Sequence, residues 1–308
     1  MAYLLLDRGR RRLVGAMAGV MLVILSGCTS LFFYPDNRQY VTPDQLRLAF
    51  EEVQLSTSDD EQLYGWWLPA EGQPQGTVYF LHGNAQNIST HFLNVSWLPG
   101  AGYNVFIIDY RGFGMSTGSP DLEGVLIDSM AGLDWALDRS DQLPVFVLGQ
   151  SLGGAMALLA SHEANRKPEG LIIDGAFAGF RRIAQEKLNQ SWITWALQVP
   201  LSWLIPANRE PLSIVGKLDL PLLFIHSNVD NVVPAHHGRL LYAAASPPKQ
   251  FLATETPHAA TFAVDEYRQT VLDFMLRHRN SAADRQIAHS QSAAESGVSD
   301  EKSERHAR

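Results

Sequence analysis

The pentapeptide Gly149-Gln-Ser-Leu-Gly153 is the part of this sequence whose residue types and spacing most directly suggest chemistry. It has the pattern Gly-x-Ser-x-Gly, with an apolar run of strand length before it and small apolar residues of helical length after it. A sharp strand-to-helix turn exposes the serine hydroxyl at the strand tip, and the flanking glycines prevent steric clashes. The pattern therefore predicts that Ser151 is a nucleophile. A glycine-rich helix start without chemistry is the alternative.

A serine hydroxyl needs a general base, and His258 lies where one is expected. In enzymes built around such a turn, an acid and then a histidine follow the serine in the chain, the histidine after the last strand. Residues 250–253 form the last apolar run of strand length, and the loop containing Pro257 and His258 follows it. We therefore predict that His258 is the base. A helix-capping histidine in a surface loop is the alternative.

The acid should follow the penultimate strand, and Asp230 lies in the loop after the apolar run 222–225. Its carboxylate would hold the imidazole in the required tautomer and stabilise the imidazolium cation that forms during attack. Asp174, at the end of the preceding strand, is the competing candidate, and Asp219 is a weaker one. A turn-forming role for Asp230 is the structural alternative.

Two backbone groups are candidates for stabilising a developing negative charge. His82-Gly-Asn-Ala85 follows the apolar run 77–81. The backbone N–H groups of Asn84 and Leu152 are predicted to converge on the substrate oxygen as an oxyanion hole. A plain turn at the strand end is the alternative, and His82 would then have a structural role.

The elements that must position these residues alternate between strand-like and helix-like segments. Nearly continuous apolar runs are typical of strands that are covered on both faces of a parallel sheet. Their alternation with helices predicts an α/β fold with a mostly parallel, doubly wound sheet, whose ligand sites lie at the carboxyl ends of the strands. The predicted strands are 50–55, 62–68, 77–81, 104–108, 145–148, 171–173, 222–225 and 250–253, and the predicted helices are 122–137, 152–163, 234–245 and 265–277.

An insertion at about 175–219 interrupts this alternation. It is helical in pattern and contains Trp192, Trp195 and Trp203. We predict a helical cap over the carboxyl edge of the sheet. Ordinary peripheral helices that pack their aromatic side chains inward are an equally good interpretation, and both can hold together.

The N-terminal segment resembles a bacterial lipoprotein signal peptide. Basic residues at 8–12 precede an apolar run at 13–25, and Leu25-Ser-Gly-Cys28 follows, similar to a lipobox. The run is shorter than the roughly 20 residues that a spanning helix needs. We therefore predict that residues 1–27 are removed and that Cys28 is acylated, with palmitate as an expected acyl group. An uncleaved anchor with an ordinary buried cysteine is the alternative.

This segment also predicts where the protein resides. Thr29, rather than aspartate, follows Cys28 and is typical of lipoproteins that are sent to the outer membrane. We expect a lipid-anchored protein of the bacterial cell envelope that faces the periplasm.

Length and composition limit the number of domains and the kinds of partner and cofactor that are expected. The 308 residues suffice for one sizeable domain, predicted at 28–279, and the polar segment 280–308 is predicted to be a disordered tail. A formal net charge of −8 argues against a nucleic-acid partner. A single cysteine excludes an internal disulfide. No metal-ligand cluster or nucleotide loop is visible in the sequence, so no cofactor is expected.

Several ordered motifs together resemble the α/β-hydrolase superfamily, and in particular its serine-aminopeptidase-like branch with the bud-emergence-type hydrolases and depalmitoylases. The resemblance extends over approximately 50–277. It implies a triad of Ser151, Asp230 and His258, with Asn84 and Leu152 as backbone donors. The family's histidine loop often reads Gly-His-Asn, whereas this chain has Pro257-His258-Ala259. The motifs are His82-Gly-Asn, Asp109-Tyr-Arg-Gly-Phe-Gly-Met-Ser116, Gly149-Gln-Ser-Leu-Gly-Gly154 and Asp230-x-x-Val-Pro234.

These features predict a membrane-anchored serine hydrolase that cleaves a carboxylic ester or thioester of a small molecule or lipid through an acyl-enzyme. A peptidase or amidase with the same triad is the first alternative. A non-catalytic envelope lipoprotein that uses the fold for binding is the second. Nothing in the sequence identifies a protein partner.

Overall fold

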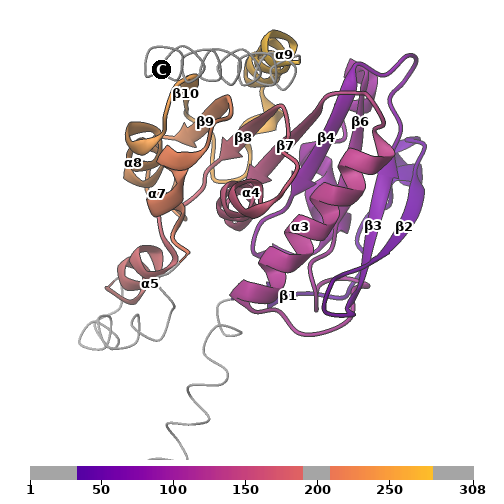
Figure 1. Ribbon diagram of the computed structural model, residues 1–308, viewed down its shortest axis with the longest axis horizontal. Coiled ribbons are helices and arrows are strands. Elements are labelled where there is room, and N and C mark those ends of the chain that lie inside the picture. Colours follow the sequence, from indigo (N-terminus) through magenta and orange to yellow (C-terminus); the bar gives the residue numbers. More distant parts are fainter. Residues whose placement is uncertain (1–32, 190–208, 280–308) are drawn as a thin grey trace, which may run out of the picture.

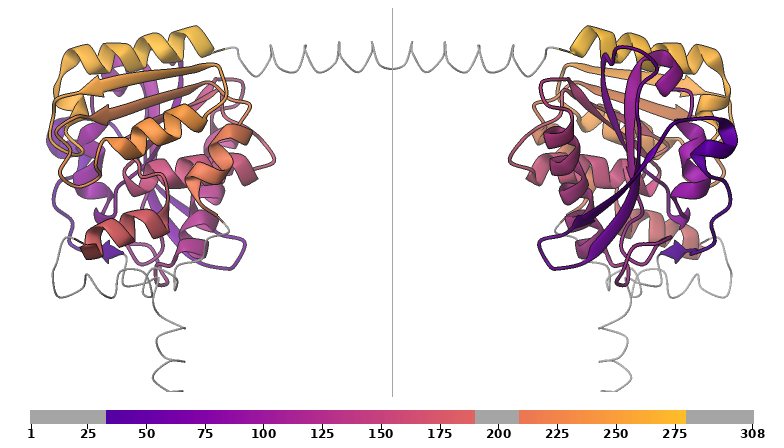
Figure 2. Two further views of the ribbon diagram at one scale, coloured as in Figure 1. Left: turned by 90° about the vertical axis from the view of Figure 1, so that its left-hand side faces the viewer. Right: turned by 90° about the vertical axis from the view of Figure 1, so that its right-hand side faces the viewer.

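The computed structural model describes residues 33–189 and 209–279 (Figure 1). The predicted strands form one eight-stranded sheet, with helices on both of its faces (Figure 2). Its strand order is β10-β9-β8-β7-β4-β6-β3-β2. The strands are β2 (Glu51–Ser56), β3 (Gln62–Leu68), β4 (Gly76–Leu81), β6 (Tyr103–Ile108), β7 (Val145–Gln150), β8 (Gly170–Asp174), β9 (Leu222–Ser227) and β10 (Lys249–Thr254).

The sheet is parallel from β6 through β4 to β10. The antiparallel pairs are those of β3, which runs antiparallel to β2 on one side and to β6 on the other. The strands β2 and β3 form a hairpin, and in the turn between them the Thr57 N–H donates to the Glu61 carbonyl. The predicted fold class, a mostly parallel doubly wound sheet, is confirmed.

The central strands are buried on both faces, which explains their continuous apolar sequence. In β4, Tyr79 and Leu81 point into one core cluster, whereas Val78 and Phe80 point into the other. Side chains alternate between the two faces of a strand, so both sets of positions must be apolar when helices cover both faces.

Helices on the two faces complete these two cores. On one face lie α3 (Leu122–Arg139), α4 (Leu152–Glu163), α7 (Pro211–Ile214) and α8 (His236–Ala244). On the other face lie α2 (Ile88–His91), η3 (Phe92–Asn94) and α9 (Asp265–His278). The helix α8 begins two residues later than predicted, because Pro234 and Ala235 form the turn before it.

Several short elements were not predicted from the sequence. They are β1 (Tyr34–Pro35), η2 (Pro43–Leu46), β5 (Ala85–Gln86), α2, η3, η4 (Pro99–Ala101) and η7 (Thr261–Ala263). Each spans four residues or fewer, which is too short for a helical or strand periodicity to show. The strand β1 pairs in parallel with β5 in a separate two-stranded sheet.

The insertion between β8 and β9 is described in part. Its described elements are α5 (Phe180–Asn189), α7 and η6 (Val215–Lys217). The three tryptophans of the predicted cap, the signal segment with Cys28, and the C-terminal segment 280–308 lie outside the described residues. Within the described ranges, no helix is both long enough and apolar enough to cross a membrane.

Candidate active site

Ser151 lies in the turn between β7 and α4, in a backbone conformation that residues with a side chain rarely adopt. Its φ is 55° and its ψ is −114°. The Ser151 N–H donates to the Asp174 carbonyl at 2.8 Å, and the Ser151 carbonyl accepts from the Gly154 N–H at 3.1 Å. Strain of this kind persists only where surrounding contacts enforce it, and it is concentrated at functional sites. The predicted strand-turn-helix geometry is present.

The two glycines of the pentapeptide are required by close packing of backbone against backbone. A Cβ atom at position 149 would lie 2.3 Å from the Gly153 carbonyl oxygen. A Cβ atom at position 153 would lie 1.9 Å from the Leu81 carbonyl oxygen. Any side chain at either position would therefore push α4 away from the ends of β7 and β4.

Asp230 and His258 form a hydrogen-bonded pair. The distance from His258 Nδ1 to Asp230 Oδ2 is 2.6 Å. The other carboxylate oxygen, Oδ1, accepts the backbone N–H groups of Val232 and Val233, each at 2.8 Å. Burial raises the pKa of Asp230, but the hydrogen bonds from His258 and from the backbone outweigh burial and lower it. Asp230 is therefore a carboxylate, the form that can orient His258.

The competing acid, Asp174, belongs to a separate network. Its Oδ2 accepts from the Gln150 amide at 2.9 Å, and its Oδ1 accepts from the Thr261 hydroxyl at 2.8 Å. Burial raises the pKa of Asp174 in spite of these bonds. Asp219, the weaker competitor, is exposed before β9. The geometry thus favours Asp230 as the partner of His258.

The three predicted triad residues converge at the carboxyl edge of the sheet. A Cβ atom at Gly175, the residue after Asp174, would lie 3.3 Å from His258 Cε1. A Cβ atom at Gly83 would lie 3.8 Å from the Ser151 Cβ. Among the described residues, Ser151 donates no hydrogen bond to His258, a contact that in many hydrolases tightens only when substrate binds.

The predicted oxyanion donors lie on either side of Ser151. Leu152 is the first residue of α4, so its N–H has no acceptor within the helix and lies at the positive end of the helix dipole. The other donor, the Asn84 N–H, belongs to the same planar peptide as the Gly83 carbonyl. His82 Nδ1 donates to that carbonyl at 2.7 Å. This bond fixes the plane of the peptide and therefore the direction of the Asn84 N–H.

Aromatic rings enclose His82 completely. Its ring centroid lies 4.3 Å from that of Tyr110 and 5.1 Å from that of His91. The Tyr110 hydroxyl donates to the His82 carbonyl at 3.1 Å. Burial lowers the pKa of His82 well below its ordinary value, so the imidazole is neutral. His91 has no signal in the sequence, because the single-turn helix that carries it is too short to show a periodicity.

The segment after β6 orders the loop that carries Asn84, one of the two predicted oxyanion donors. Asp109 Oδ1 accepts the Ile88 N–H at 2.8 Å, and its Oδ2 accepts the Met115 N–H at 3.3 Å. Gly114 packs directly on this carboxyl group with a φ of 50°. Burial raises the pKa of Asp109 to about 7. Asp109 therefore links two neighbouring loops and belongs to the framework of the site.

A cluster of two histidines and a glutamate has the spacing of a metal site. Ligand atoms of Glu186, His236 and His237 lie within 4.8 Å of one another. However, the Ala178 N–H donates to His237 Nδ1 at 3.0 Å, so a neutral His237 carries its proton on Nε2. That nitrogen lies 3.0 Å from Glu186 Oε2 and donates to it. A metal bound at Nε2 requires the opposite tautomer, so this cluster fits a hydrogen-bonded link between α5 and α8.

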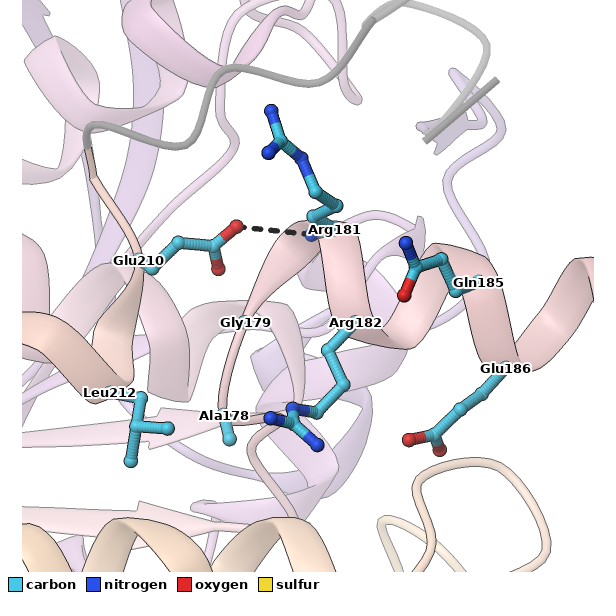
Figure 3. A pocket seen from close by; sticks show the side chains of 8 residues that line it. All are labelled: Ala178, Gly179, Arg181, Arg182, Gln185, Glu186, Glu210 and Leu212. Carbon is cyan, nitrogen blue, oxygen red and sulfur yellow. Dashed lines mark hydrogen bonds between the residues drawn. The ribbon is translucent and has the colours of Figure 1, made fainter. Parts of the chain in front are cut away.

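A cavity of about 420 Å³ lies at the first turns of α5 (Figure 3). Half of its lining residues are charged, and Glu210 accepts the N–H groups of Phe180 and Arg181 at the start of the helix. None of the predicted triad residues lines it, so this cavity is separate from the candidate active site. The lining residues are Ala178, Gly179, Arg181, Arg182, Gln185, Glu186, Glu210 and Leu212.

Comparisons with known sequences place this geometry in a family. The family model described as serine aminopeptidase, S33, matches residues 72–214. The uncharacterized protein YfhR of Escherichia coli K12 is 33% identical over 263 residues, which cover 82% of this chain and 88% of YfhR. Protein bem46 of Schizosaccharomyces pombe is 27% identical over 242 residues, which cover 76% of this chain and 79% of bem46.

Solved structures show the same fold at lower sequence identity. The esterase Pf2001 of Pyrococcus furiosus superimposes with a TM-score of 0.67 at 22% identity, over 80% of this chain and 98% of the esterase. An α/β-hydrolase of Vibrio vulnificus gives a TM-score of 0.64 at 16% identity, over 78% of this chain and 89% of that protein. The sheet order, the turn at Ser151 and the relatives above together show that the chain belongs to the serine-aminopeptidase-like family of α/β-hydrolases.

Proposed function

We propose that this protein is a serine hydrolase that cleaves carboxylic esters or thioesters through an acyl-enzyme. The observation that carries the proposal is the strained Ser151, which lies at the N-terminus of α4 and beside the Asp230–His258 pair. A strained serine next to a histidine that is oriented by a buried carboxylate has the parts that nucleophilic catalysis requires.

The geometry supports a reaction in two halves. His258 Nε2 accepts the hydroxyl proton while Ser151 Oγ bonds to the carbonyl carbon, and Asp230 stabilises the resulting imidazolium through Nδ1–H. The backbone N–H groups of Leu152 and Asn84 donate to the tetrahedral oxyanion. The intermediate collapses as the bond to the leaving group breaks and His258 gives that group its proton. Water, deprotonated by His258, then attacks the acyl-enzyme, releases the acid and restores Ser151.

Cleavage of an amide by the same triad is the competing proposal. The matching family model is described as a serine aminopeptidase, which favours a peptide or aminoacyl substrate. The structural neighbour from Pyrococcus furiosus is an esterase, which favours an ester. A non-catalytic role would leave the paired Asp230 and His258 and the strain at Ser151 without a purpose.

We further propose that the protein is tethered to the bacterial outer membrane by a lipid on Cys28 and faces the periplasm. The support is the order of a basic segment, an apolar run of limited length and the Leu25-Ser-Gly-Cys28 tetrapeptide. Replacing Cys28 with alanine should release the protein from membranes into the soluble fraction. Membrane retention of this variant would contradict lipidation.

Labelling with a fluorophosphonate probe tests the nucleophile. The probe should modify the wild-type protein at Ser151, as located by mass spectrometry of the labelled peptide, and should leave Ser151→Ala unmodified. Ser161→Ala is the matched control, since this buried serine lies on α4 and should not affect labelling. A folded wild-type protein that takes up no probe would refute the hydrolase proposal.

Substrate class is tested on unlabelled protein from a preparation that the probe has shown to be active. Nitrophenyl esters graded by acyl length are compared with aminoacyl amides at equal concentration. Faster turnover of the esters supports the proposal, whereas faster turnover of the amides supports the peptidase alternative.

A further inference from the structure

The first described segment of the chain is bound to the loop that carries an oxyanion donor. Tyr34 and Pro35 of β1 pair with Ala85 and Gln86 of β5, which follow Asn84 directly. The Asn87 amide donates to the carbonyls of Asp36 and Arg38, both at 2.7 Å. The chain is thus fixed by backbone and side-chain hydrogen bonds where it enters the domain.

Ring contacts connect the same segment to the interior of the site. The Phe33 ring lies 6.4 Å from that of Phe113, and the Phe113 ring lies 5.4 Å from that of His82. The Gly114 N–H also donates to the Asp36 carbonyl at 3.1 Å. The chain therefore enters the domain at the carboxyl edge of the sheet. In Figure 1, β1 lies at the end of the molecule opposite α9.

The distance available to a membrane tether is short. Cys28 precedes Phe33 by five positions. A fully extended chain spans at most about 3.6 Å per residue, so a lipid on Cys28 must lie within about 18 Å of Phe33. An anchor this close brings the bilayer surface to the catalytic edge rather than to the far end of the domain.

Exposed apolar side chains surround this edge, and we name them the apolar rim. They are Tyr34, Met115, Val229 and Val232, with exposed fractions of 68%, 64%, 48% and 46%. Tyr34 lies beside the loop after β4, Met115 follows β6, and the two valines flank Asp230 after β9. Loops after parallel strands share one edge of the sheet, so the apolar rim borders the entrance to Ser151.

We propose that the apolar rim rests on the bilayer and that Ser151 receives its substrate from the membrane, so the substrate class is a long-chain acyl ester of a membrane lipid. This inference rests on the proposed hydrolase activity and on the proposed tether at Cys28. Apolar side chains that face water gain free energy when they enter the interface between headgroups and acyl chains. A short tether holds the rim at that interface, and the acyl chain of a lipid then reaches Ser151 without crossing water.

Fluorescence quenching in vesicles tests the orientation without measuring activity. The full lipidated protein is reconstituted in vesicles of phosphatidylethanolamine and phosphatidylglycerol that contain nitroxide-labelled lipid. Because an acylated Cys28 has no free thiol and the chain has no other cysteine, Met115→Cys accepts one fluorophore. Leu276→Cys is the matched control, since Leu276 is 52% exposed on α9 at the opposite end of the molecule. The lipid should quench the fluorophore at position 115 and not at position 276.

A rate ratio tests the substrate class. The measured quantity is the rate of hydrolysis of a long-chain ester in vesicles divided by the rate of hydrolysis of an acetyl ester in solution. The double variant Tyr34→Asp/Met115→Asp should reduce this ratio about tenfold, because it places negative charge at the bilayer interface. Leu276→Asp should leave the ratio unchanged. A ratio that the rim variant does not alter would overturn the inference.

Other outcomes separate the possible errors. Equal quenching at both positions would refute the orientation while leaving the hydrolase intact. Labelling of Cys28 in a protein without an added cysteine would refute the tether and the orientation that depends on it. The fluorophore at position 115 could instead become shielded from solvent in the absence of lipid, to the same extent as the protein self-associates. That result would identify the apolar rim as a contact between two copies of the protein. Absence of fluorophosphonate labelling would instead refute the hydrolase proposal.

Discussion

Asp174 and Asp230 occupy equivalent places in neighbouring parts of the sheet, but their pKa values are shifted in opposite directions. Asp174 ends β8, and Asp230 follows β9 in the adjacent loop. Both are buried, with exposed fractions of 3% and 9%. Burial raises the pKa of both carboxyl groups, yet the net pKa is raised for Asp174 and lowered for Asp230.

The difference comes from the donors that each carboxyl group receives. Asp230 accepts from His258 and from two backbone N–H groups. Asp174 accepts from one amide and one hydroxyl, both neutral. Hydrogen bonds that stabilise the charged form compensate for desolvation only when they are numerous or charge-assisted. Position at the carboxyl edge is therefore not enough to make an aspartate the orienting acid.

The largest expected effect is the loss of activity when the orienting acid is removed. Asp230→Asn should lower the kcat for a nitrophenyl ester by roughly 10³–10⁴-fold, because the amide no longer favours the required histidine tautomer. Asp174→Asn is the matched variant and should retain activity within about tenfold, since Asp174 makes no hydrogen bond to His258. If Asp174→Asn were the inactive variant and Asp230→Asn the active one, the assignment of the acid would be reversed.

A smaller effect is expected on the pH dependence of stability, with opposite signs for the two residues. The folded pKa of Asp174 is above 3.8, so the stability that this group contributes is lost as the pH rises through its folded pKa. The folded pKa of Asp230 is below 3.8, so its contribution is lost as the pH falls through its folded pKa.

Urea unfolding curves measured over pH should separate these two contributions. As the pH rises above about 4, the unfolding free energy of the wild type should decrease relative to that of Asp174→Asn. As the pH falls below about 4, the unfolding free energy of the wild type should decrease relative to that of Asp230→Asn. Variant and wild-type profiles that run parallel in both ranges would contradict the assigned pKa directions.

The smallest effect concerns the loop that carries His258 toward Asp230. Ala259 has a φ of 62°, a left-handed conformation that asparagine tolerates better than alanine. Ala259→Asn, the residue common in the resembling family, should raise the unfolding free energy by about 0.5–1 kcal/mol. Ala260→Asn is the control, since Ala260 has a φ of −110° and should gain nothing. Equal effects of the two substitutions in thermal unfolding would show that backbone strain is not the cause.

Much of the fold could be predicted because the signals are local. The range 62–68 predicted for β3 and the range 152–163 predicted for α4 match the structure at both ends. In the central strands, both faces are buried, and the resulting apolar runs mark their positions. The short elements between β4 and β6 could not be predicted, since hydrogen bonds to distant residues such as Asp109 stabilise them.

In the candidate site, too, features with local sequence signals could be predicted, whereas contacts between distant residues could not. The order of Ser151, Asp230 and His258 is visible in the sequence, but Asp174 fits the same rule almost as well. His82 was recognised as a structural candidate, whereas the rings of Tyr110 and His91 around it carry no sequence signal. The roles proposed for Ser151, Asp230 and His258, and the proposed lipid on Cys28, are predictions that the experiments above test.

The sequence by itself determined the alternation of strands and helices, the glycines around Ser151 and the chain order of the three triad candidates, because the strand, turn and helix signals that locate them each depend on residues close together in the chain. The tertiary structure decided which aspartate faces His258 and which rings enclose His82. It also placed the entering chain beside the loop that follows Asn84. Each of these choices depends on contacts between residues far apart in the sequence, and the burial and hydrogen bonds that result set the direction in which the pKa of each carboxyl group is shifted.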